Sequence, residues 1–236
     1  QAVKIKDMPA VTGVQAVQNV TFPAFSKIRD DLPKLTESYR QVVMIVAYVM
    51  FPVMLGLSAV AHDLFAVLLS EEWMPTAPYF EVVCLAGLFS PVAVISMNIL
   101  KARSAGPLIV RLEILKKVVM TVIFAVTIPH SVMAVVWGLV AIAFCEMAIN
   151  FWATRRFTEL SLGRFLRTLL PVALLSAAMW LAVRGVGWLI PDSAVLRLLA
   201  GVTVGVVLYV GVSALLRFEA FREVCDIIKK QIVHKA

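Results

Sequence analysis

Long apolar runs separated by short polar stretches make up most of this chain. Uncharged runs occupy residues 41–61, 82–100, 118–145, 168–183 and 198–216. A helix that rises about 1.5 Å per residue needs about 20 residues to cross a hydrocarbon core about 30 Å thick. Four of these runs, with a few flanking residues, therefore each suit one span. The third run suits two spans joined by a turn at Pro129-His130-Ser131, and an amphipathic stretch from Met8 to Phe25 adds one more.

This pattern predicts an all-α fold, a polytopic transmembrane helical bundle of about seven spans, because open sheet edges are left unsatisfied in lipid. The predicted spans are residues 8–25, 38–61, 79–102, 108–129, 131–154, 168–190 and 195–216. A basic, amphipathic tail over residues 217–236 is expected to lie at the membrane surface. Since no low-complexity linker divides the chain, we expect residues 1–236 to form one helical lobe.

Lysine and arginine collect in every second loop between the predicted spans. They lie at Lys27, Arg29, Lys34, Arg40, Lys101, Arg103, Arg111, Arg155, Arg156, Arg164, Arg167 and in the tail after Leu216. The opposite side has Arg184 and Arg197 near one turn, and Lys4 and Lys6 at the N-terminal edge. Positive charge marks the cytoplasmic face, so the C-terminus is predicted to be cytoplasmic. The net charge of +7 is thus a topology signal and favours contact with anionic membrane lipids over nucleic acid.

Composition narrows the class further. A hydrophobic content of 61% and a mean hydropathy of +0.91 exclude an ordinary soluble domain. The chain begins with Gln and has no signal peptide, so we expect it to be the later part of a longer protein. Its three cysteines lack metal-site spacing, and no catalytic or phosphate-loop motif is present. The sequence therefore predicts no enzyme, no cofactor and no metal site.

The first predicted span carries a polar stripe. Gln15, Gln18, Asn19 and Phe22 recur at spacings of three and four residues, which places them along one helical face. Carboxamides inside a membrane either hydrogen-bond neighbouring helices or line a wet cavity. Three of them on one stripe exceed what simple packing needs, so both interpretations stay open.

Three ionisable residues lie well inside predicted spans. Lys116, Lys117 and Glu146 each lie about 12 Å from the cytoplasmic end at ~1.5 Å per residue. Such groups usually face protein or water because exposure to lipid is costly. A Glu146 ion pair with Lys116 or Lys117 is one interpretation and a substrate or coupling-ion role is another. Lysine can also extend toward the interface.

Two remaining patterns concern packing. The stretch His62–Pro78 combines a short apolar run with Glu71-Glu72-Trp73, which predicts a short interfacial helix ending at an aromatic residue. In the last span, Gly201, Gly205 and Gly211 predict close packing against neighbouring helices.

Six segments, in order along the chain, resemble the C-terminal half of bacterial oligosaccharide flippases. They are Val20–Asp31 (VTFPAFSKIRDD), Pro52–Leu57 (PVMLGL), Ala61–Leu64 (AHDL) with Glu72–Trp73, Leu100–Gly106 (LKARSAG), Trp137–Ala141 (WGLVA) and Pro171–Met179 (PVALLSAAM). The family is the polysaccharide branch of the multidrug/oligosaccharidyl-lipid/polysaccharide exporter superfamily. One departure is Ser70-Glu71-Glu72, which stands where the family usually has a glycine before the tryptophan.

The resemblance implies a bacterial inner-membrane transporter with fourteen helices in two lobes around a central cavity. This chain would supply about helices eight to fourteen, and the N-terminal lobe would be its partner. The implied cargo is an undecaprenyl-diphosphate-linked oligosaccharide, moved by alternating access. The carboxamide stripe could then serve glycan hydroxyls, while Arg29, Lys101 and Arg103 could meet the diphosphate. Positive-inside bias alone also explains those three cations.

Two other functions stay open at this point. A cation-coupled multidrug exporter of the same superfamily would need essential intramembrane carboxylates, and Glu146 is the only acidic residue well inside a predicted span. A membrane glycosyltransferase or polymerase would need large outer loops, whereas the longest predicted outer loop here is about sixteen residues.

Overall fold

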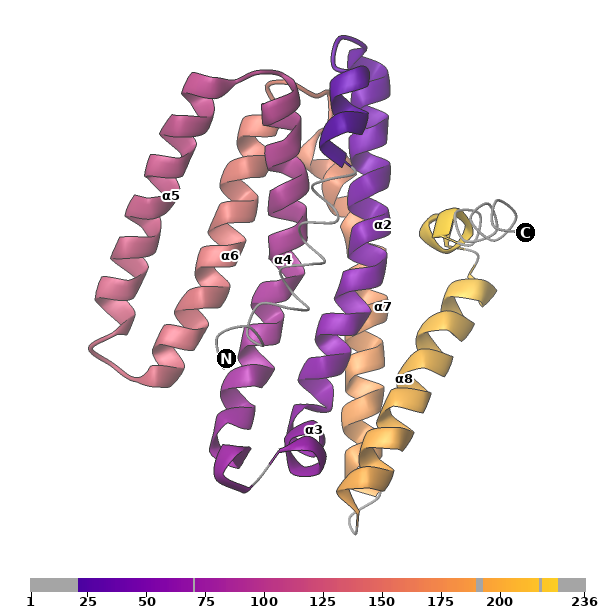
Figure 1. Cartoon of the computed structure of the whole chain (residues 1–236). Helices are drawn as coiled ribbons and strands as arrows, with labels where there is room; N and C mark the ends of the chain where they lie inside the picture. Colours follow the sequence, from indigo (N-terminus) through magenta and orange to yellow (C-terminus); the bar gives the residue numbers. More distant parts are fainter. Residues whose placement is uncertain (1–20, 70, 190–192, 217, 225–236) are drawn as a thin grey trace. The chain divides into compact units, whose positions relative to one another are not determined.

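The computed structural model describes residues 21–69, 71–189, 193–216 and 218–224. Throughout these ranges the regular secondary structure is helical (Figure 1), which confirms the predicted all-α class. The carboxamides Gln15, Gln18 and Asn19 lie outside the described residues, as does most of the predicted tail. Of the first predicted span, residues 21–25 are described, and they belong to a helical segment that covers residues 21–27.

Between residues 32 and 215, the described part of the chain has eight helical elements. They are α2 (Leu32–Ala59), α3 (Ala61–Leu68), the 3-10 helix η2 (Glu71–Thr76), α4 (Ala77–Ala102), α5 (Gly106–Thr127), α6 (Val132–Thr154), α7 (Leu162–Leu189) and, last, α8 (Ala194–Leu215). Five segments are long and apolar enough to cross a membrane: α2, Glu71–Ala102, α6, α7 and α8. Helix α5 is not among them because Arg111, Glu113, Lys116 and Lys117 crowd its first half. Its membrane crossing stays a prediction.

The helix ends follow side-chain caps that hydropathy does not show. Asp31 Oδ1 accepts a hydrogen bond from Lys34 N at 3.1 Å, so α2 begins at Leu32 and not at residue 38 as predicted. At the predicted Pro129 turn, α5 ends at Thr127, and Ser131 caps α6 by accepting from Ala134 N at 3.1 Å. A side-chain cap of this kind stabilises polar helical turns that lie before the apolar run from which the span was predicted.

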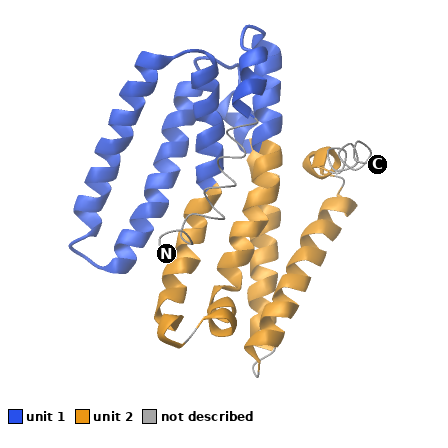
Figure 2. Ribbon diagram, in the orientation of Figure 1, with its two compact units in different colours: residues 1–43, 89–166 blue, residues 44–88, 167–236 orange. Residues whose placement is uncertain are grey.

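The chain divides into two compact units (Figure 2). Unit 1 comprises residues 1–43 and 89–166, and unit 2 comprises residues 44–88 and 167–236. Helices α2, α4 and α7 each contribute residues to both units. The single lobe predicted from the sequence stays a prediction.

In unit 1, α5 and α6 form an antiparallel helical hairpin. Gly138 of α6 lies close to α5, because a Cβ atom there would be 3.2 Å from both Ile123 Cγ2 and Thr127 Cγ2. Near the other end of the hairpin, Leu112 of α5 joins a buried cluster with Met97, Leu100 and Ala153. These contacts place one face of α5 against α4 and α6.

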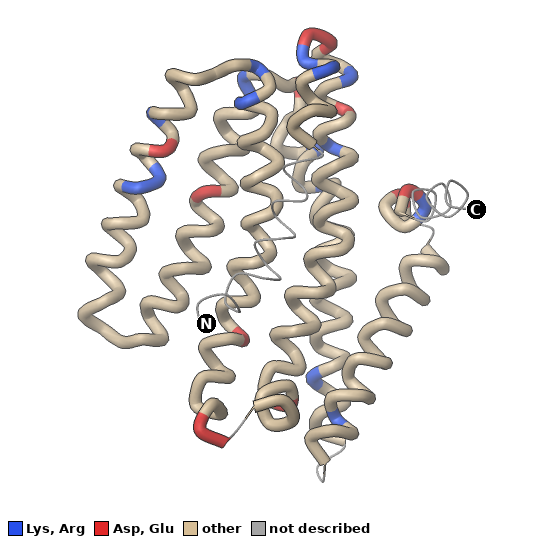
Figure 3. The backbone as a smooth tube through the Cα atoms, viewed as in Figure 1, with Lys and Arg blue, Asp and Glu red and all other residues tan. Residues whose placement is uncertain are grey.

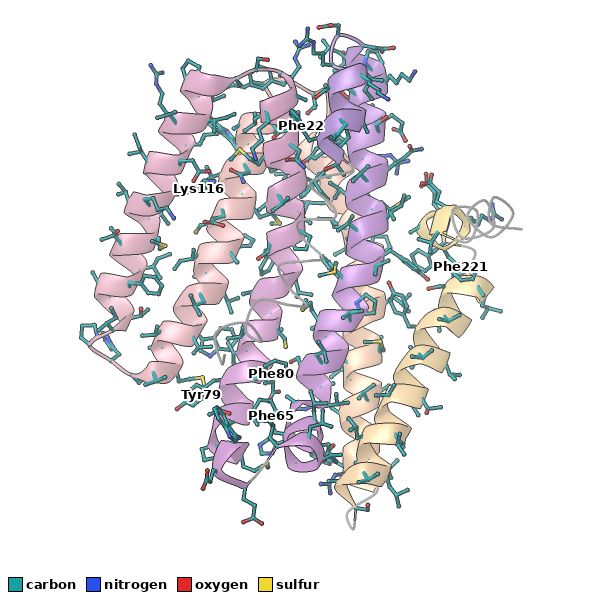
Figure 4. The ribbon with its side chains drawn as sticks, in the orientation of Figure 1. Phe22, Phe65, Tyr79, Phe80, Lys116 and Phe221 are labelled. Carbon is teal, nitrogen blue, oxygen red and sulfur yellow. The ribbon has the colours of Figure 1, made fainter. Side chains whose placement is uncertain are left out.

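In unit 2, the short helix α3 packs on α8 and next to α4. The rings of Phe65 in α3 and Phe80 in α4 lie 5.4 Å apart (Figure 4). The helix predicted after residue 61 is thus confirmed. On α8, Gly201 and Gly205 both lie close to Val183 of α7, as predicted. The prediction was wrong for Gly211 as far as the described residues go, because a Cβ atom there would meet none of them within 4 Å.

Candidate functional site

Unit 1 gathers its basic loops at one end, opposite the α5–α6 turn (Figure 3). Arg103, after α4, donates from Nη1 to the Arg29 carbonyl oxygen at 2.6 Å. Glu159, between α6 and α7, donates its backbone N–H to Thr36 Oγ1 at 3.0 Å. One bond therefore joins the loop before α2 to the loop after α4, and the other joins the start of α2 to the loop after α6, as the alternating charge pattern requires of loops on one side.

Arg103 has a fixed position because of the way α4 ends. Ser104 has a φ of 53°, in the left-handed region. Its N–H bonds to the Lys101 carbonyl at 3.0 Å, and the Ala105 N–H bonds to the Leu100 carbonyl at 3.1 Å. This pair of bonds is the Schellman arrangement that closes a helix C-terminus. Arg103 is the last residue before the reversal, so its side chain leaves the helix toward the loop that holds Arg29.

Two arginines and one aspartate form the resulting cluster. Asp30 Oδ1 lies 3.6 Å from Arg103 Nη1, and Asp30 Oδ2 lies 3.4 Å from Arg29 Nε. The Asp30 side chain is 85% exposed, while that of Arg103 is 27% exposed. The cluster has one excess positive charge and guanidinium N–H groups that suit phosphate oxygens.

The structure unites some of the predicted site residues and separates others. Arg29 and Arg103 come together. Lys101 lies in the last turn of α4 and is exposed, and its side chain has no hydrogen bond or ion pair among the described residues. Phe22 is 42% exposed on the helical segment 21–27. Its relation to the three carboxamides stays a prediction.

The ion pair between Glu146 and a lysine of α5 is not formed within the described part of the chain. Lys116 is buried and pairs with Glu113 on its own helix (Figure 4), while Lys117 is exposed. Glu113 lies one turn nearer the basic end, so the ammonium group extends toward that end along its own helix. Glu146 is half-buried and has no cation within 4.0 Å among the described residues. A coupling role for Glu146 stays a prediction.

A buried polar seam joins α2, α4 and α6 in unit 1. The hydroxyls of Tyr39 and Ser96 are hydrogen-bonded at 2.7 Å, and Thr154 Oγ1 donates to the Ser96 carbonyl at 3.0 Å. One turn away, Asn150 Nδ2 donates to the Ala93 carbonyl at 3.0 Å. Ser96 is a polar residue inside the uncharged run 82–100, whereas Tyr39 stands among polar residues before the run 41–61, where one more hydroxyl group gives no signal.

A second buried bond ties α4 to the segment that precedes α2. Asn98 Nδ2 donates to Thr21 Oγ1 at 2.7 Å, and both side chains are buried. The bond therefore holds the described end of the first predicted span against the basic end of α4.

In unit 2, two arginines that break the charge alternation are each paired with an acid. Arg197 Nε donates to Asp63 Oδ1 at 2.8 Å. Arg184 pairs with Glu81 and also stacks on the Trp180 ring at 5.1 Å. Pairing with an acid lowers the energetic cost of placing a cation in or near the membrane. It therefore explains why these two arginines can lie outside the alternating pattern of basic loops.

The described helices define the class: a multi-pass helical membrane protein. Residues 1–78 match a family model described as "Polysaccharide biosynthesis protein". An uncharacterised membrane protein in the capsule (cps) region of Klebsiella pneumoniae is 31% identical over 103 residues, 44% of this chain and 21% of that protein. The lipopolysaccharide biosynthesis protein WzxC of Escherichia coli K12 is 33% identical over 76 residues, 32% of this chain and 15% of that protein.

A longer match is to the teichuronic acid biosynthesis protein TuaB of Bacillus subtilis 168, 22% identical over 187 residues, 78% of this chain and 38% of that protein. The matched parts thus span less than half the length of each relative. No solved structure matches the chain significantly. These findings confirm the resemblance to the polysaccharide-exporter family that the six segments indicated.

Proposed function

We propose that this chain is the C-terminal half of a bacterial transporter that moves an undecaprenyl-diphosphate-linked oligosaccharide across the inner membrane. The observation that carries the proposal is the similarity to membrane proteins of polysaccharide biosynthesis, one of them named for lipopolysaccharide. The transporter works by alternating access, and an N-terminal lobe completes its cavity. The chain acts in transport and not as an enzyme.

The cluster of Arg29, Asp30 and Arg103 supports this proposal through its chemistry. A diphosphate headgroup needs countercharge when it leaves the membrane surface, and guanidinium groups supply paired donors to phosphate oxygens. Arg103 is only partly exposed and is held by backbone contacts at the end of α4. A fixed cation costs less entropy to engage than a mobile surface lysine, so we assign Arg103 the main contact and Lys101 a supporting one.

Passage of the glycan requires hydrogen-bonding groups inside the membrane. We assign this role to Gln15, Gln18 and Asn19, with Phe22 on the same stripe, because carboxamides are costly in lipid and suit hydroxyl groups. Glu146 is the residue that would bind a coupling ion. It is half-buried in α6, between the Pro129 turn before this helix and the basic loop after it.

The proposal includes an orientation in which the basic loops of unit 1 face the cytoplasm. In a variant without Cys84, Cys145 and Cys225, we expect Glu71→Cys to react with a membrane-impermeant maleimide added to intact cells. Arg156→Cys is expected to react only after the membrane is permeabilised, because positive loops stay inside. Both side chains are exposed, so access and not burial decides the result. Labelling of Arg156→Cys in intact cells would overturn the orientation.

Export is tested in a strain that lacks its own polysaccharide flippase. Expression of the full-length protein should restore surface glycan, measured by glycan-specific staining. Replacing Gln15, Gln18 and Asn19 together by leucine should leave expression nearly unchanged and reduce the surface glycan strongly. Val14→Leu with Val17→Leu is the matched control on the same segment, because it changes size without removing a polar group.

The outcomes separate the function from the stripe. Absence of surface glycan with the unaltered protein contradicts the proposed function. Normal export by the triple variant leaves the function standing and makes the carboxamides a packing feature.

A further inference from the structure

Helix α6 of unit 1 has an exposed apolar stripe along most of its length. Five exposed residues recur at spacings of three and four, which places them on one side of the helix. They are Trp137, Ala141, Phe144, Ala148 and Trp152. The two tryptophans at the ends of the stripe are 51% and 58% exposed. The α6 residues that bond to or lie closest to α4 and α5, such as Asn150 and Gly138, are buried and lie on other faces.

Two adjacent arginines follow this stripe at the basic end of unit 1. Arg155 is the C-cap residue of α6, Arg156 comes next, and both side chains are exposed. The Arg156 guanidinium stacks on the Trp152 ring, with its central carbon 5.0 Å from the ring centroid. The surface of α6 therefore changes from apolar to cationic within about one helical turn of roughly 5.4 Å.

The guanidinium N–H groups of both arginines are available to a ligand. Neither side chain has a hydrogen bond or an ion pair within the described part of the chain, whereas Arg40 and Arg103 each have an acidic partner. Stacking occupies the face of the Arg156 guanidinium and leaves its N–H donors, which lie in the plane of the group, for an anion. Because the ring also holds Arg156 in place, less side-chain entropy is lost when a ligand binds.

The position of this surface in the membrane favours lipid as its ligand, and its charge favours an anionic headgroup. Helix α6 is long and apolar enough to cross a membrane, and Trp152 lies in its last turn. Tryptophan concentrates where the hydrocarbon core meets the headgroups, so the two arginines one turn farther lie at the level of the phosphates. The ammonium of a zwitterionic headgroup would meet two cations that have no acidic partner, whereas an anionic headgroup would compensate both.

We propose that the basic end of α6 binds an anionic phospholipid of the surrounding bilayer, of the phosphatidylglycerol type, with its phosphate at Arg155 and Arg156. Two guanidinium groups offer paired N–H donors to the phosphate oxygens. One acyl chain lies along Trp152, Ala148 and Phe144. These residues cover about 12 Å at ~1.5 Å per residue, within the roughly 15 Å that one leaflet contributes to the hydrocarbon core. The site depends only on α6 crossing the membrane and not on the transported cargo.

Native mass spectrometry of the purified full-length protein tests the site. The protein is incubated with palmitoyl-oleoyl phosphatidylglycerol or the matching phosphatidylethanolamine, and retained lipid is counted as the collision energy rises. We expect phosphatidylglycerol to be retained in preference to phosphatidylethanolamine. Arg155→Gln with Arg156→Gln should reduce retention of phosphatidylglycerol about tenfold or more and remove the preference. Lys27→Gln with Lys34→Gln is the matched control, because it removes the same charge from two exposed side chains before and at the start of α2.

A second pair of variants tests the aromatic part of the site. Trp152→Leu keeps an apolar side chain but removes the ring on which Arg156 stacks, so it should weaken retention of phosphatidylglycerol several-fold. Trp137→Leu is its control, because the same change is made on the same stripe about 22 Å away at ~1.5 Å per residue.

The remaining outcomes would contradict the proposal in different ways. Equal retention of both lipids by the unaltered protein overturns the preference for an anionic headgroup. Unchanged retention in the double arginine variant, or an equal loss in the double lysine variant, overturns this end of α6 as the site. Displacement of phosphatidylglycerol by a polyprenyl diphosphate would assign the two arginines to the cargo instead.

Discussion

Replacing Arg103 by alanine in the full-length protein is expected to lower polysaccharide export about tenfold or more. Arg103 donates to the Arg29 carbonyl at 2.6 Å and lies 3.6 Å from Asp30, so it joins two of the three basic loops. Hydrogen bonds to charged groups contribute about 1.5–3 kcal/mol, and each 1.4 kcal/mol is about a factor of ten. If Arg103 also meets the diphosphate, the same substitution removes the countercharge. Surface glycan in the flippase-deficient strain measures the effect.

Arg111→Ala is the matched control. Arg111 has the same charge, lies near the same end of unit 1 on α5, and is exposed without a hydrogen bond or ion pair among the described residues. Arg103→Lys keeps the charge and loses the guanidinium fork, so it separates attraction from geometry. An equal loss of export in Arg111→Ala would show that only the total positive charge of this end matters.

Gly138→Leu is expected to destabilise the protein by about 1–3 kcal/mol, the usual cost of overpacking a close contact. A Cβ atom at Gly138 would already lie 3.2 Å from Ile123 Cγ2 and Thr127 Cγ2 on α5. A larger side chain must push the two helices of the α5–α6 hairpin apart. Leucine favours helix over glycine by up to about 1 kcal/mol, so any net loss reports the lost packing. The melting temperature in detergent measures it.

The control for this substitution is Ala141→Leu, on an exposed face of the same helix. It should leave the melting temperature nearly unchanged. An unchanged melting temperature in Gly138→Leu would mean that α5 moves away at little cost. That result would also weaken the description of α5 and α6 as one packed hairpin.

The sequence alone predicted most of the helices and the gathering of the basic loops of unit 1 at one end. These features are local, because an uncharged run long enough to cross a membrane predicts a span whatever its packing partners are. The Pro129 turn and the helix after residue 61 follow from the same local pattern. The start of α2 was missed because an Asp31 cap adds polar turns that hydropathy does not record.

Pairings between distant residues required the tertiary structure. Lys116 and Glu146 lie at the same predicted distance from the cytoplasmic ends of their helices. In the structure, however, the Lys116 ammonium group pairs with Glu113 on its own helix. Depth can be read from residue counts, but which side chain a flexible lysine meets depends on how the helices pack.

The sequence by itself determined the all-helical membrane class, the alternating charge and the resemblance to polysaccharide exporters, because each depends on residue type and spacing along the chain. Only the tertiary structure decided that Arg197 meets Asp63 and that Arg103 meets Arg29. These features join segments as many as 134 residues apart. They exist only once particular faces of the helices have packed, since an apolar span gives nearly the same hydropathy on every face.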